Sequence, residues 1–268
     1  MSTSKRLETA REAFERRDEA SSAKVHDPEA IAQAAVESHG RASDQYIGNM
    51  VYGGLDGIIT TFAVVSGVAG AELGAGVIVI LGLANLLGDG LSMAVGAYLS
   101  SRSEQEYYEK ERAREAWEVD HFPEGERAEM IEIYQGQGYS EEEAQKLVEI
   151  ISRDKERWLD SMMVDELGML ADEKKPILSA LATLASFIVA GSVPLLIYFL
   201  GLITPLNPAL SFPISLALSG LALFGLGAAK VFITERNFLK SGLEMLIVGG
   251  LSASVAYLVG VLLKGVGG

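Results

Sequence analysis

The hydrophobic residues of this chain are gathered into long runs, and polar residues fill the segments between them. A helix needs about 20 apolar residues to cross the hydrocarbon core of a bilayer, and every run reaches that length. We therefore expect an all-α membrane protein with five transmembrane helices. The runs cover about 47–71, 73–99, 176–203, 211–234 and 242–263.

The apolar runs also carry signs of how their helices pack. The first two are separated only by a few residues around Ala71–Gly74, which predicts a tight helical hairpin. Gly53 and Gly57 have the spacing that lets helices approach closely, either within one chain or between chains. Pro194 lies inside the third run and predicts a kink there, because proline cannot complete the helical hydrogen-bond ladder.

Charged residues divide the chain in the same way. Only four of the 22 Lys and Arg residues, and five of the 36 Asp and Glu residues, lie outside residues 1–46 and 101–175. Apolar runs of this length, nearly free of charge, exclude a soluble globular protein. We expect an N-terminal arm with a charged helix near 5–20, a transmembrane hairpin, a helical domain, and three more spans. Their boundaries are 1–46, 47–100, 101–175 and 176–268.

The segment 101–175 is expected to form a three-helix domain inserted between transmembrane helices 2 and 3. Its first helix continues out of the second span to about residue 119, and Pro123 separates it from a helix over about 124–135. After the Gly136–Gly138 turn, Ser140 is placed to cap a third helix. That helix, or a further one after it, extends to about Gly168.

Lys and Arg set the expected orientation, because they are enriched in loops that stay in the cytosol. Seven precede the first run, eleven lie between the second and third, and three lie at 230–240. None lies near residue 72 or in the loop 204–210. We expect the N-terminus and residues 101–175 in the cytosol and the C-terminus outside. No signal peptide is visible, so the expected location is the cytoplasmic membrane of a prokaryote.

Composition removes several classes of function. The net charge is −14 and no basic patch balances it, so we expect no nucleic-acid partner. The chain has no cysteine, which excludes disulfides, thiolate metal sites and cysteine nucleophiles. No Gly-rich phosphate loop followed by Lys and Ser or Thr is present, which argues against work driven by a nucleotide.

Two aspartates lie inside apolar runs, Asp56 in the first and Asp89 in the second. A charge at the centre of a bilayer costs about 2.5–3.5 kcal/mol even on insertion scales, so such residues indicate a functional site. Met93 lies one turn beyond Asp89 on the same helix face. A thioether beside carboxylates suits a divalent transition metal better than Mg²⁺ or Ca²⁺, although Met93 taken alone is better explained as an ordinary apolar residue.

Acidic residues and methionines recur at helical spacing in the segment 101–175. Carboxylates crowded on one helix face repel one another unless a cation lies between them, whereas a solvated acidic face needs none. Paired methionines fit a solvated face poorly, since they gain nothing from water. The candidate metal ligands are Glu111, Glu115, Glu118, Glu126, Glu129, Met162, Met163 and Glu166.

The order of these motifs resembles the vacuolar iron transporter family. The hairpin carries Leu55-Asp56-Gly57 and Leu91-Ser92-Met93, and the acidic insertion ends in Trp158-Leu159-Asp160-x-Met162-Met163-x-x-Glu166-Leu167-Gly168. The resemblance covers about 45–265. It implies a homodimer with five spans per chain that exports Fe²⁺, and often Mn²⁺ and other divalent ions, from the cytosol in exchange for protons. It also implies a transporter rather than an enzyme, with no permanently bound cofactor.

The resemblance assigns roles to particular residues. Asp56 and Met93 match the pathway at the dimer interface. The metal-binding domain is matched by Glu115, Glu118, Glu126, Glu129, Met162, Met163 and Glu166.

The chain also departs from the family's pattern. Asn85 stands where many relatives have a carboxylate, and Asp89 one turn away is the expected substitute in the pathway. Asn49 and Ala97 replace further acidic residues of the family. These differences bear on proton coupling and ion preference more than on the fold.

Two other functions remain open from the residues alone. The first is a membrane-tethered metal buffer or sensor without transport, which would leave Asp56 and Met93 without a role. The second is an intramembrane aspartyl protease built on Asp56 and Asp89, since paired aspartates can share a proton. The usual Gly-x-Gly-Asp pattern of such enzymes is absent, because Leu86 stands at its first position.

Overall fold

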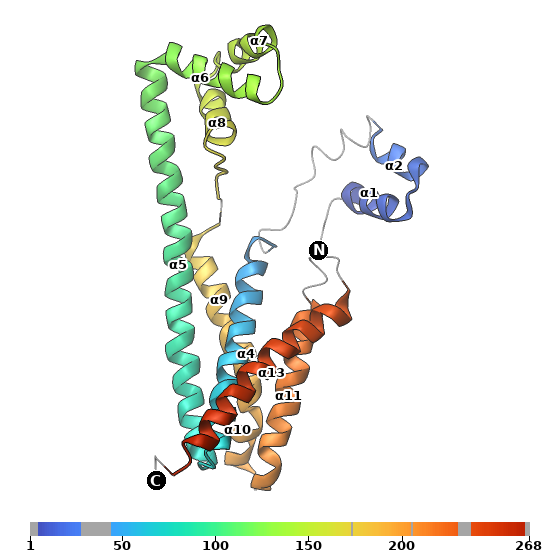
Figure 1. Cartoon of the computed structure of the whole chain (residues 1–268), viewed down its shortest axis with the longest axis vertical. Coiled ribbons are helices and arrows are strands. Elements are labelled where there is room, and N and C mark those ends of the chain that lie inside the picture. The colour runs from blue at the N-terminus through green and yellow to red at the C-terminus, as the bar shows by residue number, and fades with distance from the viewer. Residues whose placement is uncertain (1–4, 28–43, 173, 205, 230–236, 266–268) are drawn as a thin grey trace. The chain divides into compact units, whose positions relative to one another are not determined.

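The computed structural model describes residues 5–27, 44–172, 174–204, 206–229 and 237–265, and all regular structure within them is helical (Figure 1). Within these residues five helical stretches are long and apolar enough to cross a membrane, in agreement with the predicted all-α membrane protein with five transmembrane helices. The end of the fourth predicted run falls outside the described residues. The stretches are α4 (Ile47–Gly70), α5 (Ala75–His121), α9 to α10 (Pro176–Ile203), α11 (Pro208–Ala229) and α13 (Phe238–Leu262).

The N-terminal segment forms two helices where one was predicted. Helix α1 (Lys5–Arg16) ends because Arg17 adopts a left-handed backbone with φ of 53°. Asp18 then begins α2 (Glu19–Val25), since its carboxylate accepts hydrogen bonds from two backbone amides of the first turn. The polar pattern of this segment did not reveal the break.

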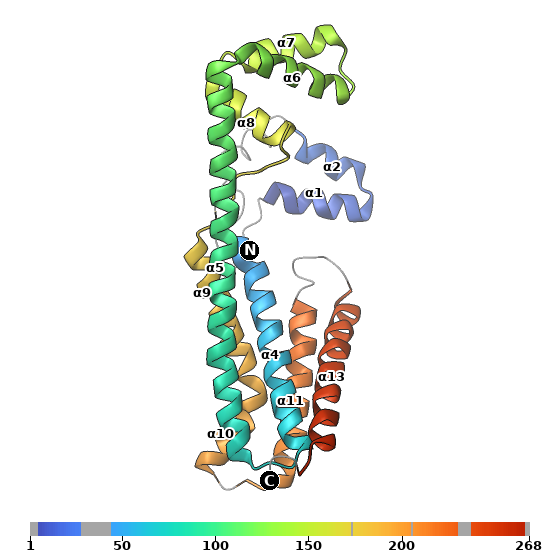
Figure 2. The same ribbon diagram turned by 60° about the vertical axis from the view of Figure 1, so that its left-hand side comes forward.

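Contacts divide the chain into two compact units, residues 1–94 with 180–268, and residues 95–179. In the first unit α4 packs along α13 and also against α11, as the views in Figures 1 and 2 both show. Glu72, in the turn between α4 and α5, pairs with Lys264 just after α13. That turn and the end of α13 therefore lie at the same end of the helical bundle.

Glycines let α4 and α9 (Pro176–Gly191) touch through their backbones. A Cβ added at Gly53 or Gly57 would lie within 3.0 Å of a backbone oxygen of Thr183 or Phe187. A Cβ at Gly191 would likewise meet the carbonyl oxygen of Gly57. The predicted close approach at Gly53 and Gly57 is therefore a contact within one chain.

This packing gives a first testable prediction. We expect Gly57→Ala to lower the melting temperature of the detergent-solubilised protein by several degrees, because a backbone carbonyl cannot move aside as a flexible side chain can. Overpacking of this kind costs about 1–3 kcal/mol. Gly76→Ala is the matched control, since nothing lies within 4 Å of a Cβ there. Equal melting of the two variants would contradict the close contact.

The third span is interrupted where a kink was predicted. Helix α9 is followed by the 3₁₀ turn η2 (Val193–Leu195), which contains Pro194, and then by α10 (Leu196–Ile203). The hydroxyl of Ser215 on α11 donates a hydrogen bond to the Pro194 carbonyl oxygen at 2.6 Å. The break is thus stabilised by a neighbouring helix, as a polar backbone group in a membrane requires.

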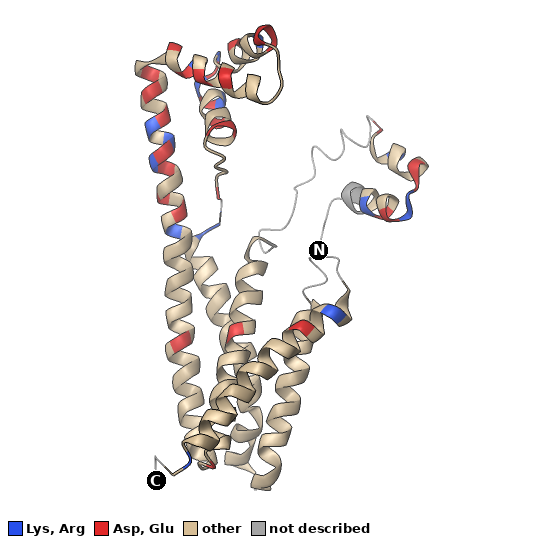
Figure 3. Cartoon of the chain, in the orientation of Figure 1, with Lys and Arg blue, Asp and Glu red and all other residues tan. Residues whose placement is uncertain are grey.

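The second unit begins as the direct continuation of the second span, as predicted, because α5 runs for 47 residues. It continues with α6 (Pro123–Gly136), α7 (Glu141–Ile151) and α8 (Lys155–Asp165). Of the two possibilities left open after the third predicted helix, a further helix is the one present, because Asp154 caps α8 after α7 ends. The segment therefore has one helix more than the predicted three. Figure 3 shows the charged residues concentrated on these helices and sparse along the other long ones.

The four helices of the second unit enclose a small apolar core. It is formed by buried residues from α5, α6, α7 and α8, with Trp158, Leu159 and Met162 supplying the contribution of α8. The full set is Val119, Met130, Tyr134, Ala144, Val148, Trp158, Leu159 and Met162. This core brings α5, α6 and α8 together.

Candidate metal centre

Three glutamates from three helices converge in the second unit. Glu115 lies on α5, Glu126 in the first turn of α6, and Glu166 at the C-terminal cap of α8. One carboxylate oxygen of each lies within 4.8 Å of the other two. We call these residues the glutamate triad. Oxygen atoms converging from three carboxylates can coordinate a divalent cation between them.

Ion pairs and a hydrogen bond hold α8 in the position that the triad needs. Arg112 on α5 donates to Glu156 and Asp160 of α8, both at 2.7 Å. Tyr134 on α6 donates its hydroxyl to Asp165 at 3.0 Å, one residue before Glu166. These contacts connect α8 to the two helices that carry the other triad members.

Two members of the triad, Glu126 and Glu166, lack a partner for one carboxylate oxygen within the described residues. Glu115 is only 1% exposed and Glu126 6%. A carboxylate oxygen of Glu126 and one of Glu166 are buried without a hydrogen-bond partner in the described part of the chain. An unpaired buried charge is costly, so these oxygens require either protons or a cation. A solvated acidic face is therefore the wrong description of these three residues.

The same burial changes how readily the triad holds protons. Burial raises the pKa of Glu115 to about 7, with repulsion from Glu166 adding to the rise and Arg114 opposing it. Burial also raises the pKa of Glu126 to about 7, and the charge of Glu129 contributes next. The pKa of Glu166 is raised by burial and then by Glu129. Near neutral pH the triad can exchange protons for a cation.

The other predicted ligands lie around the triad rather than in it. Glu118 and Glu129 are close enough for their charges to raise the pKa of both Glu115 and Glu126. Glu111 is mostly buried and pairs with an arginine. Met162 belongs to the apolar core and Met163 is fully buried. Core packing therefore accounts for Met162 without a metal.

Sequence reasoning missed one residue of this region, Arg114. Its guanidinium donates to Glu111 at 3.1 Å, to Glu118 at 2.5 Å, and to Glu115. The signal was present in the spacing, because Arg114 lies three residues after Glu111 and four before Glu118. The acidic residues were considered without Arg114, which is the hydrogen-bond partner that Glu111, Glu115 and Glu118 share.

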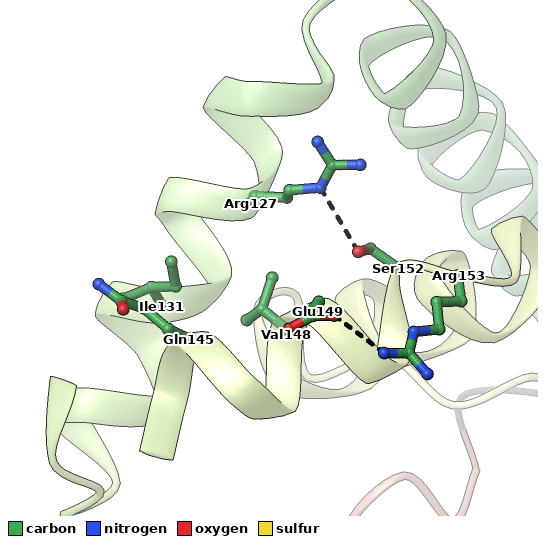
Figure 4. Close-up of a pocket in the computed structure, with 7 residues that line it drawn as sticks. All are labelled: Arg127, Ile131, Gln145, Val148, Glu149, Ser152 and Arg153. Atoms are coloured by element: carbon green, nitrogen blue, oxygen red, sulfur yellow. Dashed lines mark hydrogen bonds and ion pairs between the residues drawn. The ribbon is translucent and has the colours of Figure 1, made fainter. Parts of the chain in front are cut away.

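A cavity of about 340 Å³ lies elsewhere in the second unit, between α6 and α7 (Figure 4). Arg127 and Arg153 both line it, and Arg127 donates to Ser152 while Arg153 pairs with Glu149. Two guanidinium groups make this cavity unfavourable for a metal cation. The cavity is therefore distinct from the candidate metal centre.

In the first unit, residues 1–94 with 180–268, which we call the membrane unit, Asp56 and Asp89 lie near enough for their charges to interact. Asn85 donates to the hydroxyls of Thr60 and Thr61 at 3.2 and 3.3 Å, and Thr60 in turn donates to the backbone oxygen of Asp56 at 2.8 Å. Asn85 thus connects α5 to the helical turn that carries Asp56. The two threonines were not foreseen from the sequence.

Met93 is partly buried and packs against the apolar core of the membrane unit. Apolar packing is therefore sufficient to explain its position within one chain. Its expected role as a soft ligand in the pathway stays a prediction.

The triad predicts a pH dependence of stability. Because the pKa values of Glu115 and Glu126 are raised above the ordinary value of 4.5 to about 7, protonation stabilises the folded state. This contribution is complete below about pH 4.5 and is lost as pH rises through about 7. We expect the protein, in the presence of a chelator, to melt several degrees lower at pH 8 than at pH 5.5.

Circular dichroism at the two pH values measures this effect. Saturating Mn²⁺ should reduce the difference, since the cation replaces the protons between the carboxylates. A metal-free protein that melts higher at pH 8 would contradict the burial of the triad.

Comparison with known proteins places this architecture in a family. A profile of the VIT family matches residues 47–261. A protein of Toxoplasma gondii named vacuolar iron transporter is 36% identical over 96% of this chain and 88% of its own length. One of Plasmodium falciparum with the same name is 33% identical over 97% of both chains, and vacuolar iron transporter 1 of Oryza sativa is 33% identical over 80% of this chain and 84% of its own. The chain therefore belongs to the VIT family.

Proposed function

We propose that this protein exports Fe²⁺, and also Mn²⁺ and other divalent transition metals, from the cytosol in exchange for protons. The observation that carries the proposal is the glutamate triad, with two buried carboxylate oxygens that have no partner among the described residues. Membership of the VIT family supports metal-ion transport as the activity. The triad supplies a reason for the ion to enter the cytosolic segment.

In this proposal the triad collects ions and does not form the pore. Glu115, Glu126 and Glu166 hold the cation, with Glu118 and Glu129 as further carboxylates nearby. Glu111, Met162 and Met163 are proposed members of the same metal-binding domain. Raised pKa values make the capture of a cation release protons, so that affinity follows cytosolic pH.

The pathway through the membrane is proposed to use Asp56, Met93, Asp89 and Asn85. One chain offers too few ligands here for a dehydrated ion. Two copies related by a two-fold axis would supply two of each, so we propose a homodimer with spans one and two at its interface. Asp56 would bind the metal and carry the proton in alternation, and Met93 would favour transition metals over Mg²⁺ and Ca²⁺.

The orientation is proposed from the distribution of Lys and Arg, with residues 1–46 and 101–175 in the cytosol and the C-terminus on the other side. Of the residues used for that argument, Arg41, Lys230 and Arg236 lie outside the described part of the chain. The relatives compared are named vacuolar and come from Toxoplasma, Plasmodium and rice. They lend no support to a prokaryotic cytoplasmic membrane, which stays a prediction.

Reconstitution into proteoliposomes tests the proposal. Vesicles containing a pH-sensitive dye and a metal-sensitive dye should show metal flux coupled to opposite proton movement, with Fe²⁺ and Mn²⁺ transported faster than Mg²⁺ and Ca²⁺. Empty vesicles provide the control. Metal binding without flux would favour the buffer or sensor alternative. The protease alternative loses its basis, because the family is named for transport.

A further inference from the structure

Arg114 occupies the place of a cation beside the glutamate triad. Its guanidinium pairs with three carboxylates of α5 at once, those of Glu111, Glu115 and Glu118. Its positive charge also acts on Glu166, which belongs to α8. One fixed positive charge thus touches one triad member directly and acts on a second electrostatically.

These contacts use the same carboxylates that a metal would need. Glu115 is a triad member, and Glu118 is the carboxylate that lies four residues after Arg114 on the same helix face. A carboxylate oxygen that accepts a hydrogen bond from a guanidinium uses a lone pair that would otherwise be available to coordinate a metal ion. A divalent ion in the triad would also be repelled by the guanidinium a few ångströms away.

Arg114 is able to withdraw. Its side chain is 42% exposed, whereas that of Glu115 is 1% exposed. An arginine at the end of a long flexible stem can move its charged group into water at little cost, while the buried carboxylate cannot follow it. Exchange of the guanidinium for a metal ion is therefore sterically simple.

We infer that Arg114 is a built-in competitor of the transported metal, a specificity-determining residue whose guanidinium must leave Glu115 and Glu118 before the ion is fully bound. This inference rests on the proposed function of the triad as the metal site. It implies a minimum affinity for binding, because a cation displaces the guanidinium only if it interacts with the carboxylates more favourably than the guanidinium does. Ions with marginal affinity for carboxylates are excluded most effectively.

A purely structural role for Arg114 makes a different prediction. Pairs at i,i+3 and i,i+4 spacing stabilise a helix and relieve repulsion between neighbouring carboxylates. If that were the whole role, loss of the guanidinium would lower the melting temperature without metal and would leave metal affinity unchanged or weakened. Competition instead predicts that metal affinity increases.

The experiment measures Mn²⁺ binding to the full-length protein in detergent at pH 7.5. Electron paramagnetic resonance reports the free aqueous ion, whose six-line signal disappears on binding. Arg114→Gln should bind Mn²⁺ about tenfold more tightly than the wild type, since repulsion between close charges is reduced but not abolished by solvent. Arg153→Gln is the matched control, because it removes the same charge from a residue that pairs with Glu149 beside the cavity.

A second variant and a second measurement keep the test decisive if one variant does not fold. Arg114→Lys keeps the charge but not the planar fork that reaches several carboxylates, so its affinity should rise about threefold. The increase in melting temperature caused by Mn²⁺ should be larger in Arg114→Gln than in the wild type. If Arg114→Gln does not fold, the lysine variant decides the question.

The outcomes separate the two claims. If neither Arg114 variant binds Mn²⁺ more tightly than the wild type, the competition is overturned, while the proposed metal site stands. Absence of Mn²⁺ and Fe²⁺ binding in the wild type and in every variant overturns the proposed function, and the inference falls with it. Tighter binding in the control Arg153→Gln as well would reduce the effect to net charge and would also overturn the role assigned to Arg114.

Discussion

Asp56→Asn is expected to reduce metal flux into proteoliposomes by at least 100-fold and to abolish the coupled proton movement. The asparagine side chain keeps the shape of aspartate but has no charge to offset that of a metal ion. It also cannot take up and release a proton at any pH reached in such an assay. In a dehydrated pathway both losses are severe, because the hydrocarbon core of the bilayer supplies no charge or proton acceptor that could replace the missing carboxylate.

The control for this variant is metal binding to the second unit. The glutamate triad does not include Asp56, so Mn²⁺ affinity measured in detergent should be unchanged. Met93→Leu makes a graded comparison, since it preserves volume and removes the sulfur. We expect it to weaken Fe²⁺ flux several-fold and to narrow the discrimination against Mg²⁺ and Ca²⁺.

A different outcome would redirect attention to Asp89. If Asp56→Asn vesicles exchange Fe²⁺ for protons at near wild-type rates, Asp56 is not the carrier. Asp89 lies close enough to interact electrostatically with Asp56 and carries the only other carboxylate that we assign to the pathway. Asp89→Asn would then be the next variant to measure.

The membrane part of the fold could be predicted from sequence because its constraints are simple. The thickness of a bilayer fixes the length of each apolar run, and the interruption at Pro194 follows from the missing backbone donor. What the pattern left open was which helices touch. The glycines at 53 and 57 were compatible with contacts within or between chains, and only the backbone positions of α9 resolve this.

The second unit was harder to predict, because spacing along a helix reveals a face and not a distance. Glu111, Glu115 and Glu118 share a face of α5, yet only Glu115 joins Glu126 and Glu166 in the triad. The three carboxylates converge only because α6 and α8 fold back toward α5. The capping residues show where each helix begins, but they do not show how the helices are arranged in space. The role of Arg114 was not predicted for the same reason, since it depends on the hydrogen bonds that the guanidinium donates to the surrounding carboxylates.

Replacement of a triad member should change metal affinity and stability in opposite directions. Glu126→Gln resembles the protonated form of Glu126 permanently, with one ligand charge removed. We expect Mn²⁺ affinity at pH 7.5 to fall about 100-fold, because a neutral amide is a much weaker ligand for a divalent ion than a carboxylate. The remaining pH dependence of binding should also be shallower, since one proton fewer is displaced.

The stability of the same variant without metal should rise at pH 8. Wild-type Glu126 has its pKa raised to about 7, so at pH 8 it is ionised and destabilises the folded state relative to the unfolded chain. Glutamine avoids this cost, and we expect a gain of about 1–2 kcal/mol at pH 8, less than the full linkage value because solvent screens part of the interaction. At pH 5 the folded wild-type side chain is protonated and the unfolded one only partly ionised, so the difference should be much smaller than at pH 8.

Glu132→Gln on the same helix is the matched control, since Glu132 is exposed and lies outside the triad. It should change neither Mn²⁺ affinity nor the pH profile of melting by a measurable amount. Calorimetry for binding and thermal unfolding at pH 5 and 8 together provide the measurement. A Glu126→Gln variant that loses both metal affinity and stability at pH 8 would show that the carboxylate is held by partners in the folded protein. In that case the Glu126 carboxylate would not be an unpaired buried group that a bound cation stabilises.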